Sequence, residues 1–565
     1  MTAWTSAWWW QHLPVLPVLL PAFTAMALLI LGDHGGATSS HASAKLRWAR
    51  RIGLVSVALG LGLAGLLVWQ AAGGVLAVYR VGDWPAPYGI VLVVDRLGAM
   101  MLLLTSLVAL PVLAYASGGW DAHGRYFHAM FQFQLMGLNG AFVTGDLFNL
   151  FVFFLVLLIA SYVLMVHGQG GQRFKVGLHY VVLNLLASAL FLIGVSLLYA
   201  RTGTLNFADL ALRVPMVQGP DAMVVQAAGL VLLVVFGFKA ALAPLSMWLP
   251  ATYAAAAAPV AALFAIMTKV GVYAILRVHG VVFGPEAGHS ALAAEPLLLP
   301  LALATSVLGV LGALAAHTLE RLVAWLTVAS VGTILVGIGL FGSAGWGASL
   351  YYLANSTLVV AGLFLLSELV ASQRGDAADR LVPAAPVAQP ALLGTLMLLA
   401  AASAAGLPPL PGFIGKLLML EASSGHGWQG AIWAVILGAG FLTLLGLARA
   451  GSVLFWHVRV DPVQRGSAPS GGAGASPTLI SATLALLGAT VAMSVWAAPI
   501  QRYTAQAAEQ LLDRAAYARA VLGEAGLGAQ TARPYRFPIP ASPGASSPSN
   551  LPNQPGKPQP QEAKP

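Results

Sequence analysis

The chain has 565 residues, of which 58% are hydrophobic and 8% are charged, a balance that excludes a water-soluble protein of this size. Its net charge of +9 is explained by Lys and Arg near the ends of membrane spans, so nucleic acid is not expected as a partner. Cysteine is absent, which excludes disulfides, thiolate-bound zinc, Cys-ligated iron–sulfur clusters and attached c-type haem, and any redox centre would belong to another subunit.

Apolar runs recur almost from end to end, and a helix of about 20 residues is long enough to cross a hydrocarbon core of about 30 Å. A transmembrane barrel would instead show alternating segments of about ten residues. We therefore predict an all-α polytopic membrane protein with about fourteen transmembrane helices. The expected spans are 13–32, 52–72, 90–115, 127–145, 147–167, 176–200, 222–243, 255–278, 297–316, 322–341, 348–370, 388–407 with a broken continuation to 421, 429–457 and 477–498.

The ends of the chain and its loops predict an orientation. No Lys or Arg precedes the first span and no small-residue cleavage pattern follows it, so this span is interpreted as a retained helix rather than a signal peptide. Twelve loop Lys and Arg residues fall on one side of the membrane, whereas only four fall on the other, namely Arg80, Arg201, Arg213 and Arg277. This asymmetry predicts a bacterial inner-membrane protein with both termini outside.

Two segments share a pattern in which Pro and Gly interrupt an apolar run near one lysine. They are FGFKAALAPLSMWLP (236–250) and AAGLPPLPGFIGKLL (404–418), with expected helix breaks at Pro244, Pro408, Pro409 and Pro411. Paired interruptions are typical of transporters with inverted repeats and discontinuous helices. The expected parts are N-terminal helices 1–126, a first five-helix repeat 127–278, an outer loop 279–296, a second repeat 297–457, a linker with the last helix 458–500, and an amphipathic segment with a disordered Pro-rich tail 501–565.

Three lysines lie inside these apolar segments. Lys239 and Lys416 are each five residues from a predicted break, and Lys269 lies about ten residues inside its span. A lysine at the centre of a transmembrane helix costs about 2.5 to 3.5 kcal/mol, and burial favours its neutral form. Such lysines can exchange protons near neutral pH, so we predict a proton relay through bridging water. The alternative is that the lysines snorkel to the membrane interface.

Five segments also carry a family resemblance. They are GDWPAPYGIVLVVDRL (82–97), GDLFNLFVFFLVLLIAS (145–161), TGTLNFADL (202–210), FGFKAALAPLSMWLPATYAAAAAPVAALFAIMTKVGVYAILR (236–277) and LPPLPGFIGKLLMLEA (407–422). Together they resemble the D subunit of the multisubunit Mrp/Pha-type monovalent cation/proton antiporters, a family homologous to the antiporter-like membrane subunits of respiratory complex I.

The resemblance covers residues 13–500 and implies fourteen helices in two inverted five-helix repeats. It further implies assembly with other membrane subunits and exchange of cytoplasmic Na⁺ or K⁺ for external H⁺. In this family the lysines that match Lys239, Lys269 and Lys416 form the hydrophilic axis.

Two positions depart from the family pattern. The family has a glutamate at the position of Leu155, which is expected to pair with the lysine matched by Lys239 and to hold it charged. With Leu155 in its place, we predict that Lys239 is mostly neutral at pH 7 and that antiport is weakened or lost. Asn355 stands where relatives commonly have histidine, and its amide can hold bridging water but cannot carry a proton.

Other polar residues near span ends have two interpretations each. Asp146 is either a pathway residue or an ordinary helix cap, and His179 either takes up protons or lies at the interface. We expect His128 to be interfacial and Asp95 to form an ion pair with Arg96 as an anchor of the third span.

No Walker loop, dinucleotide fingerprint or zinc motif is present, so neither a metal, a cofactor nor an enzymatic activity is predicted. The leading hypothesis is a secondary transporter subunit whose partners are other membrane subunits, H⁺, Na⁺ or K⁺ and the lipid bilayer. The alternative is a proton-translocating membrane subunit of an NADH-quinone or hydrogenase-type oxidoreductase, and a third possibility is a structural relic without transport.

Overall fold

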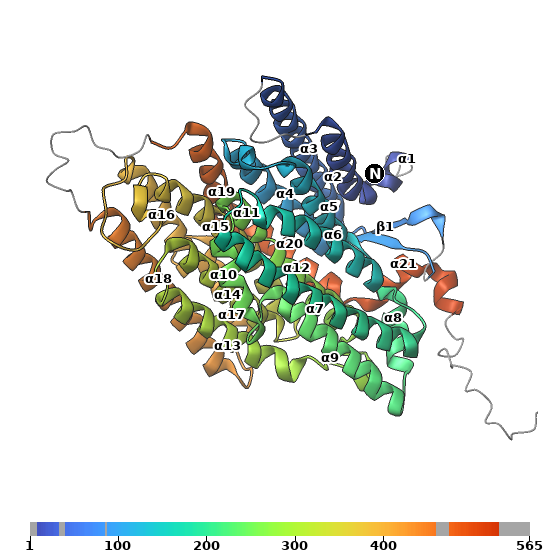
Figure 1. Cartoon of the computed structure of the whole chain (residues 1–565). Helices are drawn as coiled ribbons and strands as arrows, with labels where there is room; N and C mark the ends of the chain where they lie inside the picture. The colour runs from blue at the N-terminus through green and yellow to red at the C-terminus, as the bar shows by residue number, and fades with distance from the viewer. Residues whose placement is uncertain (1–7, 33–39, 85–87, 459–473, 530–565) are drawn as a thin grey trace, which may run out of the picture.

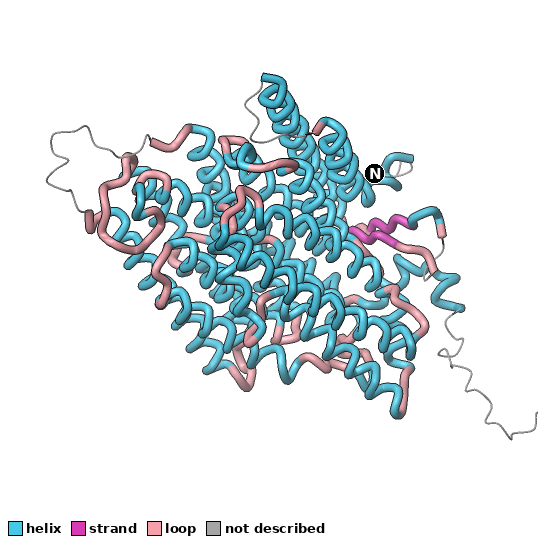
Figure 2. The backbone as a smooth tube through the Cα atoms, viewed as in Figure 1, coloured by secondary structure: helices cyan, strands magenta, loops and turns pink. Residues whose placement is uncertain are grey.

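The computed structural model describes residues 8–32, 40–84, 88–458 and 474–529. Figure 2 shows that helix dominates this part of the chain and that its strands form a single two-stranded hairpin. Twelve helical segments of the described part are long and apolar enough to cross a membrane. Two further expected spans fall outside this set: α5 is shorter, with 17 residues, and the α16–α17 pair is broken into two halves. Counting these two gives the fourteen expected spans. The predicted class, a polytopic all-α membrane protein, is confirmed.

The N-terminal helices pack against one another along the upper edge of the molecule in Figure 1, where α2 contacts α5 and α3 contacts α4. Their bounds are α1 Trp8–His12, α2 Leu16–Leu31, α3 Ser40–Ala72 and α4 Arg96–Ala116. Between α3 and α4 lie the strands β1 Ala77–Arg80 and β2 Val91–Val94.

The start of the third span differs from its predicted position at residue 90. Residues 91–94 form β2, which pairs antiparallel with β1 so that Ala77 lies opposite Val94. The β-branched and aromatic residues of the two strands favour this pairing over helix. The helix α4 begins only after Asp95, whose side chain accepts a hydrogen bond from the Gly98 amide at 2.7 Å and so caps it.

Two groups of helices follow, and an order of three helices and then one broken helix recurs in both. In each group a long helix is followed by a helix that is broken into two halves. The first group is α5 Phe127–Val143, α6 Leu147–Val166, α7 Gly171–Thr202, α9 Pro220–Ala240 with α10 Trp248–Ala255, and α11 Ala258–Phe264 with α12 Met267–Ile275. The second is α13 Glu295–Leu314, α14 Leu319–Ile338, α15 Ser343–Ala371, α16 Pro390–Ala405 with α17 Pro411–Ala422, and α18 Gln429–Phe455.

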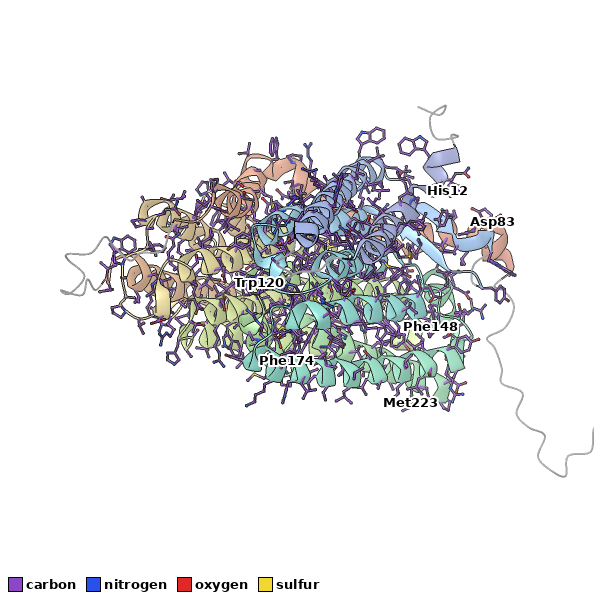
Figure 3. The ribbon with its side chains drawn as sticks, turned by 45° about the horizontal axis from the view of Figure 1, so that its top comes forward. His12, Asp83, Trp120, Phe148, Phe174 and Met223 are labelled. Carbon is purple, nitrogen blue, oxygen red and sulfur yellow. The ribbon has the colours of Figure 1, made fainter. Side chains whose placement is uncertain are left out.

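The bundle has two ends. In Figure 3, Phe174 near the start of α7 and Met223 near the start of α9 lie toward opposite ends, because these packed helices run antiparallel. Trp120 lies at the same end as Phe174, whereas His12 and Asp83 of the hairpin region lie at the end of Met223. The short helix α8 Phe207–Arg213 connects α7 to α9 at this second end.

The C-terminal part adds one more span and two docked helices. These are α19 Pro477–Val495, α20 Ala497–Leu512 and α21 Arg514–Ala529. The expected amphipathic segment is therefore two helices, of which α20 packs against α15 and α4 and α21 packs against α8. The expected linker, apart from its last residues, and the Pro-rich tail lie outside the described residues.

The core is centred on α11, α12 and α15, which are among the most completely buried spans of the described part. Arg277, just after α12, is buried there at 1% exposure, so its predicted place in an outer loop is wrong. Its guanidinium donates to both carboxylate oxygens of Asp95, at 2.6 and 3.0 Å, and to the Tyr273 hydroxyl at 2.9 Å. The predicted pairing of Asp95 with Arg96 is also wrong, because Arg96 donates to the Ala72 carbonyl instead.

Candidate functional site

The break between α9 and α10 leaves backbone groups that other elements satisfy. Ala241 adopts a left-handed conformation with φ of 63°, and the Leu242 amide donates to the Gly237 carbonyl at 2.7 Å. The Phe238 carbonyl accepts from the Trp248 indole at 3.1 Å, and the Ala243 amide donates to the Thr305 hydroxyl at 2.8 Å. The sequence interrupts the helix here with Pro244, whose missing amide hydrogen cannot continue the ladder. The first break is thus held partly by α13 of the second group.

Lys239 lies one residue before the end of α9 and is 7% exposed. Its Nζ donates to the Asn184 Oδ1 of α7 at 2.8 Å, and the rings of Phe154 and Phe238 lie 5.8 and 6.0 Å from Nζ. Asn184 is oriented by its own donation to the Tyr180 carbonyl at 2.8 Å. A positive charge at this place is stabilised by the partial negative charge of a helix C-terminus.

Lys416 occupies an equivalent electrostatic position at the second break. It belongs to α17, but its Nζ donates to the Ala404 and Ala405 carbonyls at 3.3 and 2.7 Å, which end the preceding half-helix α16. Free carbonyls at the C-terminus of a broken helix are the groups that hold cations and protons in membrane transporters. Both lysines therefore meet neutral oxygen atoms, and among the described residues no carboxylate forms an ion pair with either of them.

Small residues allow the second break to close around the Lys416 amine. Gly406 has φ of 84°, and a Cβ there would lie 2.8 Å from the Lys416 Cδ and 3.2 Å from its Nζ. A Cβ at Gly412 would overlap the Ser403 carbonyl oxygen, because α16 and α17 approach closely at that point. The position of Lys416 against α16 therefore depends on glycine in both half-helix ends.

We expect Gly412→Ala to destabilise the protein by about 1 to 3 kcal/mol or more, because the added methyl group forces α17 away from α16. The change would be measured as a lower thermal unfolding temperature of the purified protein. Gly430→Ala is the control, since no atom lies within 4 Å of a Cβ at that helical position. Equal stability of the two variants would contradict the close packing of the half-helices.

Asn355 and Lys416 line one cavity of about 30 Å³ between α14, α15 and α18. Ser330, Thr333 and Thr443 also line it, so it offers polar groups to a water molecule and is large enough to hold one. The Asn355 Oδ1 accepts from the Ser403 hydroxyl at 2.9 Å, while its Nδ2 has no partner within the described residues. Asn355 is thus placed to hold a water molecule beside Lys416.

Lys269 is fully buried on α12, close to a third irregularity in the helices. The turn at residues 265–266 separates α11 from α12, and the Lys269 Nζ donates to the Thr268 hydroxyl at 3.3 Å. A Cβ at Gly271, two residues further, would overlap the backbone of α9 at Ala240. Lys269 therefore lies near the place where α12 crosses the end of α9.

The three amines have separate hydrogen-bond partners, so a relay among them requires groups in between. Hydroxyl groups supply part of this connection. Thr305 contacts the first break, its neighbour Ser306 hydrogen-bonds Thr333 at 3.2 Å, and Thr333 lines the cavity of Lys416. These hydroxyl groups are buried between the first break and the cavity of Lys416, although no hydrogen bond among the described residues joins the Thr305 and Ser306 side chains.

Among the described residues, no hydrogen bond or ion pair joins the other predicted residues to the lysines. Leu155 is partly buried on α6 and packs in the core, next to Phe154 whose ring faces Lys239. Asp146 caps α6 by accepting from the Asn149 amide at 2.9 Å. His179 is exposed on α7, where it lines an open groove of about 160 Å³ together with Lys175 and Trp248.

Comparison with known proteins concerns the same part of the chain. The family model described as NADH:quinone oxidoreductase/Mrp antiporter, TM, matches residues 144–443, more than half of the sequence, and includes all three lysines. The chain belongs to this antiporter family.

Relatives in the antiporter family match along nearly their whole length. A probable K(+)/H(+) antiporter D subunit of Rhizobium meliloti is 38% identical over 92% of this chain and 99% of its own. The Na(+)/H(+) antiporter D subunit of Alkalihalophilus pseudofirmus is 34% identical over 91% of this chain and 100% of its own. A chain in the structure of the Mrp complex from Dietzia sp. DQ12-45-1b superposes with a TM-score of 0.79 at 28% identity, covering 90% of this chain and 100% of that chain.

Sequence reasoning about this antiporter family member did not find Asn184 or the carbonyl acceptors of Lys416. Asn184 is 55 residues from Lys239, and it is one polar residue among many in the apolar α7. The Ala404 and Ala405 carbonyls are backbone groups without a sequence signature. A signal did exist in the glycines beside the second break, since Gly in such a place permits close backbone approach.

Proposed function

We propose that this antiporter family member exchanges Na⁺ or K⁺ for H⁺ as one subunit of a membrane complex, with protons moving along Lys239, Lys269 and Lys416. One observation carries the proposal. Lys239 and Lys416 are buried at the C-terminal ends of broken half-helices, and their amines meet neutral oxygen atoms. The names of the relatives support the choice of cations and of proton antiport.

Neutral acceptors suit a group that must both bind and release a proton. An ammonium has three donors, and a neutral amine keeps donors that can still bond to the same oxygen atoms. A carboxylate beside the amine would favour its protonated form, whereas neutral oxygen atoms favour that form only weakly. Protonation of Lys239 or Lys416 is therefore opposed by burial and favoured only moderately by carbonyl and amide dipoles.

Two inverted repeats, at 127–278 and 297–457, are part of the proposal. Their support is that each of these ranges contains three helices followed by a helix broken near a lysine. Proton movement would then occur at the middle of the membrane, where the half-helices meet. Other membrane subunits of an antiporter complex are the proposed partners, in a bacterial inner membrane with both termini outside.

The proposal is tested by cation-dependent collapse of a proton gradient in everted membrane vesicles that contain the whole complex. Vesicles with this chain should lose ΔpH when Na⁺ or K⁺ is added, and vesicles lacking the chain should not. Comparison of the two cations identifies which one is exchanged. A ΔpH that responds to neither cation, in a complex shown to be assembled, would overturn the proposal.

Leu155→Glu is expected to raise antiport, because a carboxylate near Lys239 favours the protonated form of its amine. The measurement is the initial rate of cation-dependent ΔpH collapse at pH 7. Leu155→Gln is the matched control, since it adds a polar group of the same shape without charge. Antiport in Leu155→Glu no higher than in the starting protein would contradict the role assigned to this position.

A second candidate function is supported by the description of the matching family, which includes NADH:quinone oxidoreductases. In that case the same lysines would move protons in response to redox chemistry in another subunit. Purification of the native complex distinguishes the two functions. Copurified flavin or iron–sulfur subunits would favour the oxidoreductase, and their absence from a transport-active complex would favour the antiporter.

A further inference from the structure

A second row of buried polar side chains lies outside the lysine axis, along one face of α5. His128, Gln132 and Asn139 are 0%, 1% and 9% exposed. At 3.6 residues per turn they lie within about 40° of one another and extend over about 16 Å of the helix. Helices α2, α3 and α4 surround α5 in the N-terminal bundle. Three polar residues on one buried face of a transmembrane helix are costly unless they have polar partners.

One end of this row is an ion-pair cluster in which Asp121 is central. Arg50 donates to both oxygens of Asp121 at 2.6 and 2.7 Å, and the His128 Nε2 lies 2.9 Å from the Asp121 Oδ2. Burial disfavours the charged carboxylate, but hydrogen bonds from Arg50 and His128 hold the pKa of Asp121 below its ordinary value. The Arg50 side chain is 29% exposed, which connects the cluster to the surface at this end of the bundle.

The middle of the row is a cavity of about 20 Å³ lined by residues of α2, α3, α4 and α5. Gln132 and Asn139 line it together with the hydroxyl groups of Ser56, Thr105 and Ser106. Gly53 of α3 lies between Gln132 and His128. The Gln132 Nε2 donates to the Gly53 carbonyl at 3.2 Å, and the His128 Nδ1 is 3.2 Å from where a Cβ of residue 53 would lie.

Two buried polar atoms of the row have no partner within the described residues. They are the His128 Nδ1 and the Asn139 Oδ1, although the Asn139 Nδ2 donates to the Pro17 carbonyl at 2.8 Å. Leaving such a group unsatisfied costs about 1 to 3 kcal/mol. The cavity is large enough for one water molecule, and Asn139 lines it, whereas His128 lies one helical turn away from the lining residue Gln132.

Water fits this cavity better than a metal cation. None of the described residues that line the cavity carries a carboxylate, and a cation surrounded only by neutral groups would carry a large desolvation cost. His128 is bonded to Asp121 from the loop before α5, which is itself bonded to Arg50 from α3, and His167 at the end of α6 packs against Phe127, the residue before His128. By sequence α2 contains no ionisable residue, and α4 contains only Arg96 and Tyr115.

We propose that α2, α3, α4 and α5 enclose a hydrated path, separate from the lysine axis, that carries water and protons between the Arg50–Asp121–His128 cluster and Asn139. His128 would exchange its proton with water at Nδ1 while Nε2 stays bonded to Asp121. Beyond His128 the hydroxyl and amide groups of the cavity conduct the proton through bound water. The path gives the N-terminal helices a function in proton access that the lysines do not supply.

Bound water is tested first, without any requirement for transport. Pulsed X-ray radiolysis of the full chain in its membrane complex generates hydroxyl radicals from water next to buried side chains. Leu102 lines the cavity and is 1% exposed, whereas Leu28 is 0% exposed and packs only in an apolar cluster with Ala49 and Ala129. We expect oxidation of Leu102 well above that of Leu28, and loss of the difference in Gln132→Leu. Equal, background oxidation of both leucines in the starting protein would overturn the proposal.

The proton path is then tested with two glutamines of the same helix. Gln132→Leu is expected to lower the rate of cation-dependent ΔpH collapse by about tenfold or more, because it removes the amide that holds the proton-carrying water in the cavity. Gln134 is equally buried on α5 but does not line the cavity, so Gln134→Leu should leave the rate unchanged. Equal rates in the two variants, whether both normal or both reduced, would overturn the path.

If Gln132→Leu fails to assemble, Gly60→Val replaces it as the variant that narrows the cavity. A Cβ at Gly60 lies 4.0 Å from the Ser106 hydroxyl, so the larger valine side chain occupies cavity space.

Discussion

Lys416→Met is expected to lower cation-dependent proton transport by about a hundredfold or more, because a positioned proton-transfer group contributes that order to a rate. Met fills the volume of the lysine stem but cannot carry a proton, and the Ala404 and Ala405 carbonyls lose their donor. The measurement is the initial rate of ΔpH collapse in everted vesicles after the cation is added.

Two controls separate proton transfer at Lys416 from a structural role. Lys416→Arg keeps the positive charge at the end of α16 but remains protonated, so it should also stop transport while the complex still assembles. Lys175→Met removes an exposed lysine of α7 and should have no effect. Normal transport in Lys416→Arg would show that only the charge is needed and would contradict the proton-carrying role.

Asp95→Asn is expected to lower the free energy of unfolding by about 3 to 5 kcal/mol, because it leaves the buried Arg277 guanidinium without its carboxylate partner. Asn caps a helix about as well as Asp, so the cap of α4 is kept and the loss reports the ion pair. Thermal unfolding of the purified protein in detergent measures the change.

The double variant Asp95→Asn with Arg277→Met tests this explanation. Removing both charges should restore most of the lost stability, since the penalty of the single variant comes from an uncompensated buried charge. A double variant that is as unstable as Asp95→Asn alone would contradict the explanation by an uncompensated buried charge.

The sequence was sufficient for the spans and for the two main breaks because these depend on local properties. Length and apolarity predict the helices, and proline predicts the interruptions at Pro244 and at Pro408 and Pro409. The turn at residues 265–266 was missed, since no Gly or Pro marks it. Its freed Phe264 carbonyl accepts from the Tyr253 hydroxyl at 2.8 Å, a contact that local sequence cannot reveal.

The chemical partners of buried charges could not be predicted for a related reason. Arg277 and Asp95 are 182 residues apart, and a charge near the end of an apolar run is equally compatible with an outer loop. His128 was likewise expected at the interface, but the structure buries it against Asp121 of the preceding loop. Such pairings are decided by how distant helices pack, whereas the position of a lysine within its own span is visible in one segment.

The hydrogen bond between the Ala243 amide and the Thr305 hydroxyl has a consequence for biogenesis. The two residues are 62 positions apart, so the first interrupted helix emerges from the ribosome well before its stabilising partner on α13. An unsatisfied amide in lipid is unfavourable. The nascent first half must therefore keep this amide solvated, or shielded by the insertion machinery, until α13 has been inserted.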